Sequence, residues 1–119
     1  MKKELIIIFC VALLSFTFSY LIQWTMGVLF CYGMGWFAGL KGVQSFRTGF
    51  IGLCITWLLP AWWYDWQNQH ILATRMALLF GMGSHPVLFI GCTALLGGLL
   101  GGISAWCGRL SSIWIKSSE

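Results

Sequence analysis

The segment PAWWYDWQNQHILATR, residues 60–75, is the one long interruption in a chain that otherwise consists of apolar runs. It begins as an aromatic stretch, becomes polar in its middle, and ends in mostly apolar residues. Trp and Tyr concentrate where a bilayer meets water, so a segment of this kind is typical of a membrane surface. We therefore expect the rest of the chain to form membrane-spanning helices that hold this segment at one side of the bilayer.

The composition of the whole chain favours an integral membrane protein. Of its 119 residues, 59% are hydrophobic and only 8% are charged, whereas soluble domains carry roughly 25% charged residues. The formal net charge of +4 could indicate nucleic-acid binding, but the basic residues are scattered between apolar runs and form no basic stripe. The composition predicts one helical domain over residues 1–119, with no nucleic-acid partner.

The cysteines give no sign of a metal or redox site. They are odd in number, contain no C-x-x-C pair, and have no His at ligand spacing. We expect them to be small buried hydrophobes, and we expect no metal and no cofactor. The cysteines are Cys10, Cys31, Cys54, Cys92 and Cys107.

Four apolar runs predict an all-α membrane protein with four transmembrane helices. A span needs about 20 apolar residues at 1.5 Å per residue. The expected spans cover residues 5–22, 24–40, 46–64 and 86–107. The first run lacks an Ala-x-Ala cleavage site, which favours a span over a signal peptide. Pro60 is expected to kink the last turn of the third span.

An interfacial amphipathic helix is expected between the third and fourth spans, over residues 66–82. Its apolar part is too short to cross a bilayer, so it should lie in the membrane surface. Asp65 is expected to cap its N-terminus, and Gly81 to end it. Pro86, in a first-turn position, then begins the fourth span.

The distribution of basic residues predicts the orientation. Four spans place both termini on one side, together with an expected loop over 41–47 and a tail over 108–119. This side carries six basic residues and the other carries only Arg75. Under the positive-inside rule the termini are cytoplasmic and the segment 65–85 faces outward. The six residues are Lys2, Lys3, Lys41, Arg47, Arg109 and Lys116.

Small residues in the second and fourth spans are spaced for close helix packing. They form one small-xxx-small pair in the second span and two overlapping G-x-x-x-G pairs in the fourth. In lipid, helices associate through van der Waals contact, which small residues permit. The facing helix could belong to the same chain or to another. The predicted packing residues are Gly35, Gly39, Gly97, Gly98, Gly101 and Gly102.

The polar residues of the outer segment form the only candidate surface site. They could be a helix cap, a solvated helix face and a turn, or they could bind a ligand or a lipid headgroup. A catalytic Asp–His pair is a third interpretation, but the spacing of Asp65 and His70 matches no metal or nucleophile motif. We therefore expect no enzyme activity. The candidate patch is Asp65, Asn68, His70 and Arg75, with His85 nearby.

Parts of residues 46–108 resemble small multi-spanning inner-membrane proteins of bacteria that have no assigned activity. The similar stretches are Gly49–Leu58, Asp65–Arg75, Leu79–Gly81, Pro86–Leu88 and Ala94–Leu99. Such proteins combine a span that ends in an aromatic turn, an Ile-Leu-x-x-Arg helix and a Gly-rich last span. The resemblance implies a multi-pass protein of the bacterial inner membrane.

The expected function is that of a non-enzymatic accessory or scaffolding subunit. Such a subunit would dock through its Gly-rich helix faces on other integral membrane subunits or on itself, in contact with membrane lipids. The alternative is a small oligomeric channel or transporter. Ion-coupled carriers usually need an ionisable group at membrane depth, and no Asp, Glu, Lys or Arg lies in the middle of an expected span.

Overall fold

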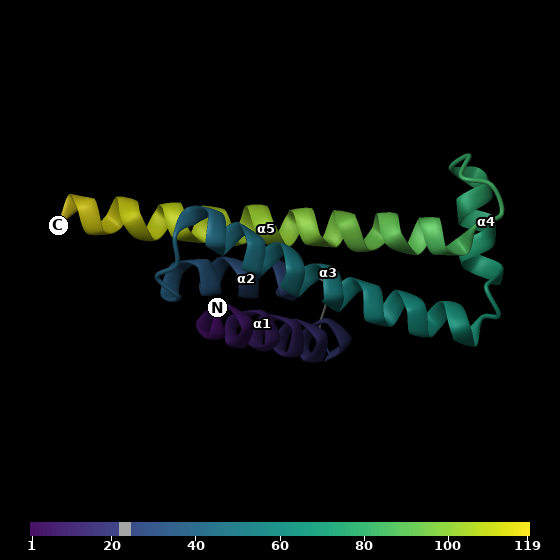
Figure 1. Ribbon diagram of the computed structural model, residues 1–119, viewed down its shortest axis with the longest axis horizontal. Coiled ribbons are helices and arrows are strands. Elements are labelled where there is room, and N and C mark those ends of the chain that lie inside the picture. Colours follow the sequence, from purple (N-terminus) through teal and green to yellow (C-terminus); the bar gives the residue numbers. More distant parts are fainter. Residues whose placement is uncertain (22–24) are drawn as a thin grey trace.

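The computed structural model describes residues 1–21 and 25–119, and in this part every element of regular secondary structure is a helix (Figure 1). The expectation of an all-α chain is therefore confirmed for the described residues. Five helices follow one another: α1 (Lys2–Leu21), α2 (Thr25–Phe37), α3 (Gly42–Gln67), α4 (Ile71–Leu79) and α5 (Pro86–Ser118).

The long helices α3 and α5 form the axis of the molecule, which measures 55 × 27 × 26 Å. They run side by side in opposite directions, while α1 and α2 lie against one part of this pair (Figure 1). The short α4 lies across the end where α3 finishes and α5 begins. At the opposite end, α5 continues past the other helices.

The interior is small and is made where the helices cross. Val11, Cys31, Leu53 and Ala105 form its buried apolar cluster. Two hydroxyl groups also join helices there: Ser45 donates to the Ala105 carbonyl at 2.9 Å, and Ser104 donates to the Val28 carbonyl at 2.7 Å. Small and hydroxyl side chains at helix contacts are typical of packing in membranes.

Two stretches expected to lie largely outside the spans belong to helices. The loop expected over 41–47 forms the start of α3, which begins at Gly42, and the expected tail over 108–119 continues α5 to Ser118. A glycine costs a helix only about 1 kcal/mol, so neither Gly42 nor Gly108 prevents it. Pro60 also lies inside α3 and does not end it.

The outer helix is shorter than expected. Trp66 and Gln67 belong to α3, and α4 covers only Ile71–Leu79. Asp65 therefore lies within α3 and does not cap the outer helix; His70 holds that N-cap position. The prediction failed because no residue between 61 and 67 breaks a helix, so α3 runs through the aromatic stretch.

The end of α4 and the start of α5 follow the sequence signals. Gly81 has a φ of +71°, and its amide donates to the Leu78 carbonyl at 3.1 Å. The next amide, of Met82, donates to the Ala77 carbonyl at 2.9 Å. This pair of bonds is the Schellman motif that a glycine after a helix end permits. Pro86 occupies the first turn of α5, as predicted.

One described helix, α5, is long and apolar enough to cross a membrane by its length and composition. The apolar α2 has 13 residues, about 20 Å of helix. Residues 22–24, where the first expected span ends and the second begins, lie outside the described residues.

Candidate functional site

Four of the predicted packing glycines lie on the face of α5 that contacts α3. A Cβ atom added to Gly97 would lie 2.6 Å from the Trp57 ring, and one added to Gly98 would lie 3.0 Å from the Phe50 ring. These distances are shorter than van der Waals contact, so the aromatic rings fill the space that the missing side chains leave. Gly102 meets the ring of Phe46 in the same way, at 2.7 Å.

At Gly101 the two helices touch through their backbones. A Cβ atom there would lie 2.5 Å from the Gly49 carbonyl oxygen and 2.6 Å from the Leu53 Cβ atom. A Cβ atom on Gly49 would in turn overlap the Gly101 carbonyl. The glycine face of α5 is therefore occupied by α3 of the same chain.

The two glycines predicted in the second span have different surroundings. Gly35 lies in α2 against the carbonyl group of Ala105 in α5. Gly39 follows the end of α2 and has a φ of +63°, and no described atom would lie within 4 Å of an added Cβ atom. Gly39 supports a turn rather than helix packing, because a left-handed φ favours glycine.

Three further packing glycines were not predicted from the sequence. Gly49 lies against Gly101, and the other two face Val11 of α1 and Tyr32 of α2. A signal existed for the first, because Ser45 and Gly49 have the small-xxx-small spacing. The three glycines are Gly49, Gly52 and Gly108.

Of the polar outer residues, the structure brings Asp65 and His70 together. The Asp65 side chain is only 6% exposed, and its Oδ2 atom contacts Nδ1 of the His70 ring. Its Oδ1 atom is buried and has no hydrogen-bond partner within the described chain. Asn68 and Arg75 are exposed, and no described hydrogen bond or ion pair joins their side chains to this pair. His85 is also exposed, at the start of α5.

The Asp65–His70 contact spans a strained turn at the end of α3. Gln69 and His70 have φ angles of 52° and 62°, in the left-handed region that favours glycine. The His70 amide donates to the Asp65 carbonyl at 3.0 Å, and the Gln69 amide donates to the Trp66 carbonyl at 3.2 Å. These bonds again form a Schellman motif, here with Gln in the position usually held by Gly.

The contact between Asp65 and His70 is local, because the two residues lie five positions apart in the chain. The neighbouring hydroxyl group of Thr74 donates to the His70 carbonyl, so it is already engaged. Among the described residues, no group of three His, Cys, Asp or Glu side chains could hold a metal ion. The contact joins the last turns of α3 to the N-cap residue of α4.

We expect Gln69→Gly to stabilise the protein, because Gly removes the steric cost of the left-handed φ. This cost is about 1–2 kcal/mol for other residues, and the greater flexibility of Gly offsets about half of it. The net gain should be about 0.5–1 kcal/mol, measured from unfolding in mixed detergent micelles. Asn68→Gly is the control, because Asn68 has an ordinary φ of −85°. If Gln69→Gly lowers the free energy of unfolding by as much as Asn68→Gly does, the left-handed conformation of Gln69 is contradicted.

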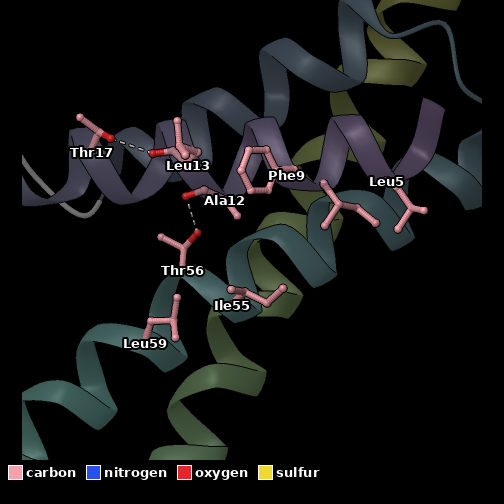
Figure 2. A pocket seen from close by; sticks show the side chains of 9 residues that line it. Leu5, Phe9, Ala12, Leu13, Thr17, Ile55, Thr56 and Leu59 are labelled. Atoms are coloured by element: carbon pink, nitrogen blue, oxygen red, sulfur yellow. Dashed lines mark hydrogen bonds between the residues drawn. The ribbon is translucent and has the colours of Figure 1, made fainter. Parts of the chain in front are cut away.

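A second feature is an open groove between α1 and α3, with a volume of about 520 Å³ (Figure 2). Among the described residues that line it, the polar side chains are those of two threonines. Thr17 donates to the Leu13 carbonyl at 2.8 Å, and Thr56 donates to the Gly52 carbonyl at 2.8 Å. The Thr56 hydroxyl also lies 3.4 Å from the Ala12 carbonyl of α1, a second acceptor that Figure 2 marks. Since both hydroxyls bond to backbone carbonyls, the groove presents mostly hydrocarbon and suits a lipid acyl chain. Its lining residues are Leu5, Ile8, Phe9, Ala12, Leu13, Thr17, Ile55, Thr56 and Leu59.

Comparison of the chain with protein-family models, with curated proteins and with solved structures found no match.

Proposed function

We propose that this protein is a small, non-enzymatic integral membrane protein of the bacterial inner membrane, with four spans and cytoplasmic termini. The observation that carries this proposal is the contrast between the side chains exposed on the outside of the helices and those buried between them. Phe9 of α1, Leu59 of α3 and Leu88 of α5 are all more than half exposed. The residues buried between these helices are mostly Gly, Ala, Ser and Thr. Large apolar side chains outside and small ones inside suit a lipid environment.

The lengths of α3 and α5 and the residues at their ends fit helices that reach both surfaces of a membrane. The hydrocarbon core of a bilayer is about 30 Å thick. With 26 and 33 residues, α3 and α5 are about 39 and 50 Å long. Trp62, Trp63 and Trp66 lie exposed at the end near α4, where an aromatic belt would sit. Arg47 lies near the start of α3, and Arg109 lies toward the end of α5. Because the two helices are antiparallel, both arginines lie away from α4, on the proposed cytoplasmic side.

The hydrogen bonds of the hydroxyl groups between the helices support an accessory role over transport. The hydroxyl groups of Ser45, Thr56 and Ser104 donate to backbone carbonyls, so they do not line a path for ions. The glycine stripe that was expected to dock on a partner is covered by α3. We therefore place docking to other subunits on the remaining apolar faces of the helices.

The topology is tested by labelling single cysteines in intact cells. In a variant whose native cysteines are replaced by Ala, Gln69→Cys should react with a membrane-impermeant maleimide from outside. Ser117→Cys should react only after the cells are opened, and Lys41→Cys should behave like Ser117→Cys. Labelling of residues 69 and 117 from the same side would contradict the four-span topology. Release of the protein from membranes by alkaline carbonate would contradict membrane insertion altogether.

A further inference from the structure

Helix α5 has two opposite faces that differ in residue size. The face against α3 and α2 consists of small residues such as Gly97, Gly101 and Ala105. The opposite face carries exposed large apolar side chains, and six of them, each 45 to 60% exposed, form a stripe along the helix. This outer stripe is Leu96, Leu99, Ile103, Trp106, Leu110 and Ile113.

The outer stripe has the spacing of a coiled coil. The steps between its successive members alternate between three and four residues, which is the repeat of positions a and d in a heptad. Positions a of the repeat are then held by Leu96, Ile103 and Leu110. Leu99, Trp106 and Ile113 hold positions d. A stripe of this kind packs against another helix that carries the same repeat.

Lipid covers only part of this stripe. Pro86 starts α5 next to α4, at the proposed outer surface. From there, about 20 residues cross the hydrocarbon core, which brings the inner boundary near Trp106. Leu110 and Ile113 extend past it into the cytoplasm, where exposed apolar side chains mark an interaction surface.

We propose that this stripe pairs with the same stripe of a second copy of the chain, parallel and in register. The inference rests on the proposed membrane topology, because all inserted copies then point the same way. A two-fold axis along the membrane normal brings identical residues of two such copies together. The seam matches itself along its whole length, from the membrane into the cytoplasm.

Two residues beside the seam support the parallel arrangement. Arg109 holds a g position and Trp114 the following e position, and g and e′ positions meet across a parallel pair. Within the described chain, the Arg109 Nε atom is buried without a hydrogen-bond partner. Trp114 is 80% exposed. Pairing would bring the Arg109 guanidinium of each copy to the Trp114 ring of the other, a favourable cation–π contact.

The test compares two isoleucines of the same helical turn by disulfide cross-linking in native membranes. In the cysteine-free background, Ile113→Cys places a thiol at position d, where two copies face each other within disulfide reach. Ile115→Cys places it at position f, which points away from the seam. We expect Ile113→Cys to form at least ten times more linked dimer than Ile115→Cys. Equal cross-linking at both positions, or none at position 113, would overturn the pairing.

The mass of the purified protein in mild detergent provides a second measurement. The wild type and Ile115→Glu should have the mass of two copies, and Ile113→Glu that of one. A wild type with the mass of one copy at all concentrations would also overturn the pairing. Extraction of the membranes with alkaline carbonate distinguishes the two possible failures. A wild type that has the mass of one copy but stays in the membrane refutes only the pairing. A wild type that carbonate releases from the membrane refutes the proposed function.

Discussion

Gly35→Ala and Gly108→Ala should each lower the free energy of unfolding by about 3 kcal/mol, the upper end of the usual cost of overpacking. A Cβ atom on Gly35 would overlap the carbonyl group of Ala105, and one on Gly108 would overlap that of Tyr32. These obstacles are backbone atoms, which cannot rotate away as a side chain can. The helices α2 and α5 would have to separate along their whole contact.

The same substitution at two other glycines of these helices provides the control. An added Cβ atom at Gly33 in α2 or Gly91 in α5 would have no atom of the described residues within 4 Å. Ala favours a helix over Gly by about 1 kcal/mol, so Gly33→Ala and Gly91→Ala should stabilise the protein. Unfolding in mixed detergent micelles, followed by circular dichroism, measures all four variants. Changes of the same sign at all four glycines would show that α2 and α5 do not make this contact.

The second large effect is expected at the outer turn. His70→Ala removes the side chain that contacts Asp65, which leaves a buried carboxyl group with no side-chain partner. An unsatisfied buried polar group costs about 1–3 kcal/mol, and we expect a loss of about 2 kcal/mol in the free energy of unfolding. His85→Ala is the matched control, because His85 is exposed and makes no side-chain cap bond.

A double variant distinguishes the loss of the contact from other effects of His70→Ala. Replacing both partners by apolar residues leaves no buried polar group unsatisfied and is often nearly neutral. Asp65→Leu combined with His70→Ala should therefore recover most of the lost stability. If the double variant is less stable than His70→Ala alone, the carboxyl group has a stabilising role that does not depend on His70.

Predictions from the sequence held where the signal is local. Gly81 and Pro86 end one helix and begin the next as expected, because a left-handed φ and a fixed proline φ act on their own residues. The prediction that Asp65 caps the outer helix was wrong, because capping also depends on where the preceding helix ends. Its side chain could cap a helix, but the preceding aromatic residues allow α3 to continue past it. Which of two possible helices a residue joins depends on more than its own preference.

The sequence by itself determined the helical class, the sparse charge and the small-residue stripe of α5, because each is a property of composition or of spacing along one helix. Only the tertiary structure decided which surfaces meet. It places the α5 glycines against α3 of the same chain, puts Gly39 in a turn where no described atom would touch an added Cβ atom, and joins Asp65 to His70. These contacts depend on where α3 and α5 cross and on how the chain turns after Gln67. Both are set by packing between residues far apart in the chain, which spacing along one helix does not encode.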